Sequence, residues 1–484
     1  MGLLKVGETC WRAAAAPRVK FLVDDQDYFD ALMRTLRQAR RSIHFLGWSF
    51  DPRTRLTPDE PDPTQIGALL AELVRDRPEL DVRLLIWRSS LPISATQSFF
   101  PHRAKRWFKG TGVRFELDNT VPFGACHHQK IVVVDDAVAF IGGADFGCDR
   151  WDTSLHLDAD RWRRTAGGRA CPARHEVMAM TDGPLARDLG EHFRARWRTA
   201  VGAIGPPAAP DGLNPWPEEL AADLENVPAA VSRTAPAWRA QPEVQEIEAL
   251  TLEAIAAARR LIYMENQYFT WPLAVEALAA RLAEPEGPEV VLVCTARSPS
   301  YFDQITMDRA RSTAIWRLTT GDVFGRFHAL SPHTADGAII IAHAKLMIVD
   351  DALARISSAN LNNRSHGFDT EAELAIEAGT EDEAAAITRL RNRLAGHWIG
   401  QPPEAVAEMA RLTGSLAQGL WALDSGRRLR PLRPQRLGPV GEFIADFHIG
   451  DPTDPADSWR PFARRRQLTE EARALRAALT RPQD

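Results

Sequence analysis

Hydrophobic positions along the chain alternate between a spacing typical of helices and short apolar runs typical of buried strands. Because strands that are apolar on both faces lie between helices, this alternation predicts an α/β fold with largely buried mixed sheets. The pattern occurs twice, with helices expected at 28–41, 185–197, 244–260 and 387–398 and strands at 43–48, 82–88, 131–134, 137–141, 262–268 and 290–297.

The two halves also share residues. Residues 127–145 read HHQKIVVVDDAVAFIGGAD and residues 342–360 read AHAKLMIVDDALARISSAN, and nine of the nineteen positions are identical without a gap. A second similarity joins ARRSIHFLGWSF (39–50) to ARRLIYMENQYF (258–269). These matches indicate two copies of one domain, fused head to tail.

The duplication predicts a domain organisation. Between the copies lies a proline-rich stretch, which favours an irregular linker across the surface. After about residue 402 the similarity between the halves ends, so the remainder is expected to form an extension or cap. We therefore predict an N-terminal domain, a linker, a C-terminal domain and a cap over 1–204, 205–241, 242–402 and 403–484.

Composition narrows the class of protein. The chain has 484 residues, of which 45% are hydrophobic and 25% charged, as in a folded globular protein. The net charge is −5, without the basic excess typical of nucleic-acid binding, so no nucleic-acid partner is expected. The five cysteines are scattered, and no apolar run has the length of a signal peptide or a membrane span. These features favour a cytoplasmic protein with reduced thiols.

Each copy carries a His-x-Lys pair, at His128 and Lys130 and at His343 and Lys345. In an extended strand these two side chains share a face, and an imidazole beside an ammonium group suits a phosphate. A lone His-x-Lys is most often a surface strand, whereas two copies in a duplicated domain would bring both histidines to one interface. One histidine would then attack phosphorus and the other would protonate the leaving alcohol, with the lysines stabilising charge and no metal or cofactor required.

The two motifs H-x-K-x-x-x-x-D resemble those of the phospholipase D superfamily. HHQKIVVVD with IGGADFGCDRWD, and HAKLMIVDD with SSANLNNRS and FDTEAELAIE, are similar to the two signatures of its lipid-hydrolysing members, and YMENQYF to a further segment. The resemblance covers about 18–400. It implies two tandem α/β/α domains, with mixed sheets flanked by helices, related by a pseudo-two-fold axis, and an active site at their interface.

The resemblance also implies roles for residues outside the His-x-Lys pairs. Glu176 and Glu371 match acidic positions that orient the histidines, whereas Asp135 and Asp350 match structural positions. The positions expected to contact substrate are Asn360, Ser358, Asp145, Gly143 and Asn266.

Trp151 and His175 are weaker candidates, taken from residue chemistry alone. An aromatic ring at Trp151 suits a choline-like headgroup, although core packing explains a tryptophan equally well. His175 is as typical of a structural histidine as of a partner to Glu176.

The leading hypothesis is a phospholipase D that hydrolyses the distal phosphodiester of a glycerophospholipid, such as phosphatidylcholine, to phosphatidic acid and a free alcohol. Transfer to another alcohol is compatible with the same phosphohistidine. The alternatives are a cardiolipin synthase-like phosphatidyltransferase, a nuclease of the same superfamily, and a non-catalytic binding module. We expect a monomer, because the duplicated halves supply the paired site. We also expect peripheral binding to a phospholipid membrane, favoured by 14 tryptophans and by basic runs at 427–436 and 462–466.

Overall fold

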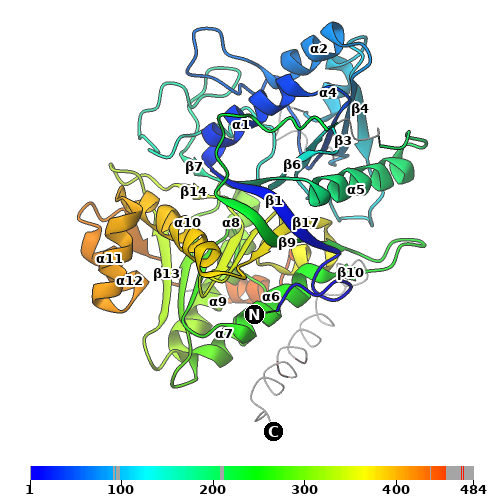
Figure 1. Cartoon of the computed structure of the whole chain (residues 1–484). Coiled ribbons are helices and arrows are strands. Elements are labelled where there is room, and N and C mark those ends of the chain that lie inside the picture. Colours follow the sequence, from blue (N-terminus) through cyan, green and yellow to red (C-terminus); the bar gives the residue numbers. More distant parts are fainter. Residues whose placement is uncertain are drawn as a thin grey trace.

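A computed structural model describes residues 2–90, 93, 99–207, 212–435, 438–453, 470 and 473 of the chain (Figure 1). The basic run expected at 462–466 lies outside these residues. The first half contains β1 (Arg12–Val23), α1 (Asp24–Gln38), β2 (Ser42–Gly47), α2 (Ile66–Asp76), β3 (Asp81–Trp87), α4 (His102–Trp107), β4 (Arg114–Asp118), β5 (Ile131–Val134), β6 (Val138–Gly142), β7 (Arg174–His175), β8 (Val177–Asp182) and α5 (Pro184–Ala200).

The second half repeats this series and adds elements at its end. It contains β9 (Leu224–Ala235), β10 (Val244–Gln245), α6 (Glu246–Ala257), β11 (Leu261–Glu265), α7 (Pro272–Leu282), β12 (Glu289–Val293), α8 (Tyr301–Ile305), α9 (Met307–Gly321), β13 (Phe327–Pro332), β14 (Ile341–Ala342), β15 (Leu346–Val349), β16 (Leu353–Ser357), the π-helix η1 (Arg364–Phe368), β17 (Glu371–Glu377), α10 (Glu381–Ile399), α11 (Pro403–Thr413), α12 (Leu416–Leu423), β18 (Leu429–Pro431) and α13 (Pro439–Asp446).

The strands of both halves form one continuous mixed sheet. The order is β4-β3-β2-β5-β6-β8-β1 in the first half and β13-β12-β11-β15-β16-β17-β9 in the second. The two series meet where β1 pairs antiparallel with β9, at the boundary between the upper, blue-to-teal half and the lower half in Figure 1. Because the order reads the same from either edge inwards, the halves are related by a pseudo-two-fold axis at this pair. The predicted α/β fold with two tandem domains is confirmed.

Helices cover both faces of the sheet. On one face α5 and α10 contribute Phe193, Trp197, Leu394 and Trp398 to a hydrophobic core that extends through both halves. On the other face each half has its own core, under α1 and α2 in the first half and under α6, α7 and α9 in the second. Each domain is therefore an α/β/α sandwich, and the shared core under α5 and α10 fixes the halves relative to each other.

The expectation of an irregular linker over 205–241 is wrong for its second part. Residues 224–235 form β9, a twelve-residue strand at the centre of the sheet. The prolines that motivated the prediction lie mostly before this strand. Pro228, within it, faces Ala15 of β1, whereas the pairing of β9 with β17 begins only at Ala229. A proline is tolerated there because its missing N–H costs no bond to β17.

The two-aspartate turn of each motif is built alike. Asp135, Asp136, Asp350 and Asp351 all have φ between 53 and 59°. Two successive positive φ values define the tight hairpin turn that aspartate tolerates. The first aspartate of each pair also accepts three backbone N–H groups, from Arg40, Arg41 and Ser42 in the first half and from Arg259, Arg260 and Leu261 in the second. Asp135 and Asp350 thereby tie the motif hairpin to the start of β2 and of β11.

The region after α10 is integrated with the second half. β18 extends the sheet by pairing with β13, and α11 packs against α10. Asp451 accepts a hydrogen bond from Thr270 and from the backbone of Asn363 and Arg364, beside the second motif. Among the described residues, no helix has the length and apolar character needed to cross a membrane.

Candidate active site

Each His-x-Lys segment is held by the opposite half of the chain. The backbone N–H of His128 donates to Thr370 O at 2.9 Å, and the backbone N–H of His343 donates to His175 O at 2.9 Å. β14, which precedes His343, pairs in parallel with β7. Both motif segments therefore lie at the interface between the halves, each beside the residue that precedes the other half's predicted glutamate.

The glutamates contact the histidines across this interface. His128 Nδ1 donates to both carboxylate oxygens of Glu371, at 2.9 and 3.0 Å. His343 Nδ1 likewise donates to Glu176. The sequence placed each glutamate after the motif of its own copy, but each one orients the histidine of the other copy. Since Nδ1 is bonded to the carboxylate, Nε2 of each ring is the nitrogen left to react.

Burial dominates the ionisation of these groups. The side chains of His128 and His343 are only 17% and 12% exposed. Burial, reinforced by the neighbouring lysines, holds the pKa of both imidazoles well below the usual range. Burial also raises the pKa of Glu176 and Glu371 to about 7. In the free protein both imidazoles are therefore neutral, the form that a nucleophile requires.

Lys130 is paired within the first half. Its Nζ donates to His128 O at 2.6 Å and lies 3.4 Å from a carboxylate oxygen of Asp145. Asp145 in turn accepts the backbone N–H groups of Trp48 and Ser49. Asp145, predicted to contact substrate, is thus largely occupied in balancing Lys130 and in anchoring the end of β2.

Lys345 has a different environment. Its Nζ donates to His343 O and to Gln267 Oε1 (3.4 Å) and lies 3.0 Å from His343 Nδ1. Burial lowers the pKa of Lys345 to about 7; the carboxylate of Glu176 opposes this shift and the charge of Lys130 adds to it. An anion bound beside Lys345 would favour its charged form, so the arrangement suits a phosphate.

Two hydroxyl groups hold Glu371. Ser358 Oγ donates to Glu371 Oε2 at 2.5 Å, and Ser365 Oγ donates to Oε1 at 2.7 Å. Ser358 is fully buried. The structure thus gives Ser358 a positioning role in place of the expected contact with substrate. Ser365, in η1, was missed because it lies outside the repeated motif.

Gly143 leaves space that other site residues fill. A Cβ atom at this position would lie 2.4 Å from Glu176 Oε1 and 3.2 Å from Lys345 Cδ. Any side chain would therefore displace Glu176. Gly143, expected to bind substrate, instead allows the carboxylate to reach His343 from the other half.

The two predicted asparagines differ in whether their side-chain oxygens accept hydrogen bonds. Asn266 Oδ1 accepts the backbone N–H groups of Leu361 and Tyr268, so it connects β11 to the second motif rather than facing substrate. Asn360 is buried, and its Oδ1 has no hydrogen-bond partner in the described part of the chain. Asn360 therefore retains a polar atom that is available for substrate.

Trp151 does not form the headgroup cage considered from the sequence. It is 7% exposed and belongs to the core of the first half, so the core-packing interpretation applies. The neighbouring Arg150 helps to lower the pKa of His343. It also lines a cavity of about 480 Å³ together with Ser49, Asp51, Arg53, Phe100, Gly147, Cys148, Asp149, Thr165, Ala166, Gly167 and Arg169.

Family models match both halves of the chain. The model described as phospholipase D matches residues 35–272, and the model described as cardiolipin synthase, PLD-like domain, matches residues 251–398. The chain belongs to the phospholipase D superfamily. Both motif histidines and both crossed glutamates lie within the matched residues. Only the regions before residue 35 and after residue 398 are unmatched.

Curated superfamily members resemble the chain at low identity. Phospholipase D alpha 4 of Arabidopsis thaliana is 24% identical over 75% of this chain and 62% of its own length. Phospholipase D1 of Saccharomyces cerevisiae is 24% identical over 74% of this chain and 26% of its own length. Cardiolipin synthase A of Pseudomonas putida is 26% identical over 74% of this chain and 64% of its own length. The chain thus matches from about a quarter to just under two thirds of these relatives.

A solved structure shares the fold. Phosphatidylserine synthase of Haemophilus influenzae superposes with a TM-score of 0.56 at 13% identity, covering 84% of this chain and 97% of that one. At this identity the match supports the fold of the superfamily and nothing finer.

Proposed function

We propose that the protein is a phospholipase D-type enzyme that cleaves the distal phosphodiester of a glycerophospholipid through a covalent phosphohistidine. The observation that carries the proposal is the crossed pair, in which Glu371 holds His128 and Glu176 holds His343 at one interface. Two carboxylate-oriented imidazoles from related halves supply a nucleophile and an acid for in-line displacement at phosphorus.

In the first step His128 Nε2 attacks phosphorus and the bond from phosphorus to the headgroup oxygen breaks. His343, protonated beside the bound anion, donates its Nε2 proton to that oxygen, and the free alcohol leaves. In the second step His343 takes a proton from water, whose oxygen displaces His128 and yields phosphatidic acid. Lys130 and Lys345 stabilise the non-bridging oxygens throughout.

The surroundings of the two histidines support this assignment of roles. Glu371 is fixed by Ser358 and Ser365, so the ring of His128 is held rigidly for attack. The ammonium of Lys345 lies 3.0 Å from His343 Nδ1 and makes the His343 imidazolium a stronger acid. A stronger acid is the better proton donor to a poor leaving group.

A phosphatidyltransferase is the second candidate, because one relative is named a cardiolipin synthase. It would use the same phosphohistidine with a lipid alcohol in place of water. For either reaction the protein would work as a monomer bound peripherally to a phospholipid surface. The cavity lined by Arg150 also contains Arg53 and Arg169 against Asp51 and Asp149, so its lining carries one more positive than negative charge, which suits an anionic lipid headgroup.

Headgroup release tests the proposal. The purified protein would be incubated with vesicles of phosphatidylcholine, phosphatidylglycerol or phosphatidylserine, and separately with single-stranded DNA. We expect release of a headgroup alcohol, or appearance of cardiolipin from phosphatidylglycerol, and loss of either product in His128→Ala. Cleavage of DNA without lipid turnover would replace the proposal with a nuclease, and inactivity on every substrate would reject it.

A further inference from the structure

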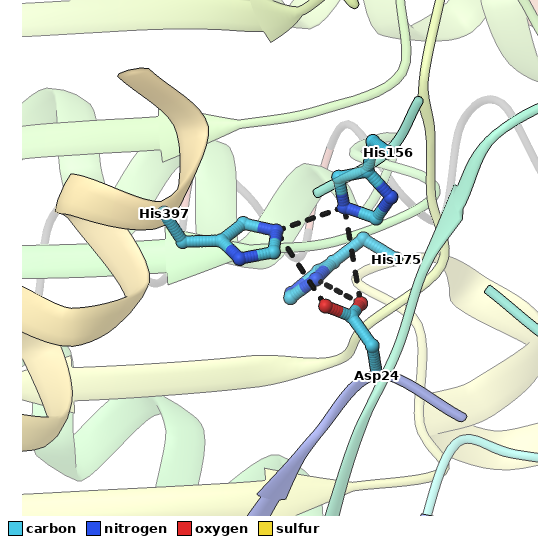
Figure 2. A group of neighbouring side chains, drawn as sticks. All are labelled: Asp24, His156, His175 and His397. Atoms are coloured by element: carbon cyan, nitrogen blue, oxygen red, sulfur yellow. Dashed lines mark hydrogen bonds and ion pairs between the residues drawn. The ribbon is translucent and has the colours of Figure 1, made fainter. Parts of the chain in front are cut away.

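A second cluster of histidines, drawn in Figure 2, lies at the interface between the halves, and one of its members, His175, immediately precedes Glu176 of the crossed pairs. Asp24 begins α1, His156 follows β6 in a long loop, His175 ends β7 and His397 lies in the last turn of α10. One potential ligand atom from each residue lies within 4.8 Å of all the others. The first three are at most 1% exposed, so the cluster is closed to bulk water.

Two of the histidines also bind a carboxylate outside the cluster, through the ring nitrogen that faces away from its centre. His175 Nε2 donates to Glu265 Oε2 at 2.8 Å, and His156 Nδ1 donates to Asp152 Oδ2 at 2.9 Å. With the proton on the outer nitrogen of each ring, the inner nitrogen would direct its lone pair into the cluster. A carboxylate behind a histidine in this way is the usual support of a metal-binding imidazole.

The inner atoms are close to one another. His175 Nδ1 lies 2.7 Å from Asp24 Oδ1, and His156 Nε2 lies 2.8 Å from His397 Nε2. Asp24 Oδ2 lies 3.7 Å from His397 Nε2, and Asp24 Oδ1 lies 3.9 Å from His156 Nε2. Ligands about 2.0 Å from a tetrahedral ion lie about 3.3 Å apart, within this range. Figure 2 shows the three rings and the carboxylate converging on one point.

Hydrogen bonds alone leave this cluster incomplete. Asp24 Oδ2 is buried and has no hydrogen-bond partner among the described residues. His175, bonded to a carboxylate at each nitrogen, would also need two protons if no ion were bound. A divalent cation would accept the free lone pairs of Asp24 and of the inner nitrogens together.

We propose that Asp24, His156, His175 and His397 bind one divalent transition-metal ion, with Zn²⁺ as the best match. Three imidazole nitrogens and one carboxylate oxygen form a tetrahedral donor set that suits zinc. All four positions are filled by the protein, so the site is structural. It joins α10 of the second half to α1 and β7 of the first, and it fixes His175, the residue immediately before Glu176. The site is independent of the substrate proposed above.

Metal content and spectroscopy of the full chain test this site. The protein would be expressed with Zn²⁺, its metal content measured, and the ion removed with a chelator and replaced by Co²⁺. We expect one Zn²⁺ per chain, a lower melting temperature after removal that returns with Zn²⁺, and the intense visible absorption of tetrahedral Co²⁺. His397→Gln should lose all three signals. The matched control is His333→Gln, a buried histidine bonded to a backbone oxygen outside the cluster, which should keep them.

A second variant addresses the risk that His397→Gln does not fold. Glu265→Gln removes the support behind His175 while keeping all four ligands, and we expect its zinc affinity to fall about 10-fold or more. A chain with no zinc above background, a Co²⁺ spectrum of octahedral type, or equal affinity in wild type, Glu265→Gln and His397→Gln would overturn the proposal. The cluster would then be an imidazolium network held by hydrogen bonds.

Discussion

The two copies of the motif share a plan but differ in how their charges are balanced. In the first copy, Lys130 lies beside the carboxylate of Asp145. The second copy has the amide of Asn360 at the equivalent position, and the pKa of Lys345 falls to about 7. The carboxylates also differ, since two serine hydroxyls hold Glu371 but no hydroxyl bond to Glu176 occurs among the described residues.

This difference indicates how a duplicated site acquires two roles. The symmetric part, two imidazoles with crossed carboxylates, supplies two equivalent bases. The asymmetric part holds one histidine rigidly through Glu371 and places an ammonium beside the other through Lys345. The comparison therefore predicts that equivalent substitutions in the two copies have different effects.

The histidines should give the largest effects. We expect His128→Ala and His343→Ala each to lower kcat by about 10⁴-fold on a natural phospholipid, because one removes the nucleophile and the other the acid. With a p-nitrophenol leaving group, which departs without a proton, His343→Ala should recover most of its rate for the first step. His128→Ala should not. Steady-state and burst kinetics on both substrates measure the effect, and recovery in His128→Ala instead would reverse the roles.

The crossed carboxylates should come next. Glu371→Gln is expected to lower kcat by about 10²–10³-fold, because it withdraws the charge that stabilises the His128 imidazolium. In a His128→Ala background the same change should cost almost nothing, whereas Glu176→Gln should still reduce the residual rate. A double-mutant cycle that coupled His128 to Glu176 would contradict the crossed arrangement.

The pH dependence should show a narrow maximum of kcat/KM near pH 7. Burial raises the pKa of Glu371 to about 7, so activity falls as pH drops and the carboxylate becomes protonated. Burial lowers the pKa of Lys345 to about 7, so activity also falls as pH rises and the ammonium is lost. Bound phosphate favours the charged lysine, and the alkaline limb of kcat should lie at higher pH. A flat profile between pH 6 and 8 would contradict this account.

Stability should respond to the same carboxyl group. Because the pKa of Glu371 is higher in the folded than in the unfolded protein, its ionisation removes stability as pH rises from the unfolded value through about 7. Glu371→Gln should therefore melt at a higher temperature relative to wild type at pH 8 than at pH 5. Calorimetry at both pH values measures this difference, and the opposite trend would contradict the shift.

Exchanging the residues that distinguish the copies should give the smallest effects. Asn360→Asp adds a negative charge to the phosphate site, and KM should rise about 10-fold. Asp145→Asn removes the charge that balances Lys130, and KM should fall a few-fold, at the cost of weaker anchoring of β2. Equal changes of KM in the same direction would show that charge balance does not distinguish the copies.

The sequence predicted the elements of the fold better than their connections. The helical and strand periods placed the core of each half, and the repeated motif identified both His-x-Lys pairs. It did not predict β1 and β9 as the central pair, because the prolines near 205–217 favoured an irregular linker. The strand at 224–235 depends on pairing with β1 about 200 residues away, which no local pattern records.

Parts of the site depend on the same long-range pairing. Nothing in the spacing of Glu176 and Glu371 shows that each crosses to the other half, since this follows from β7 beside β14 and from Thr370 beside His127. Asp24, His156 and His397 lie in unrelated segments, and only the folded chain brings them to His175. Trp151 was misleading because its residue type fits a core and a cation site equally.

Trapping the covalent intermediate tests the central claim most directly. The protein would be mixed with a phospholipid labelled at phosphorus, quenched in alkali within milliseconds, and digested for mass spectrometry. The account predicts a phosphatidyl group on the peptide that contains His128, and none in His128→Ala. Label on the peptide that contains His343, or no histidine-bound label during turnover, would contradict it.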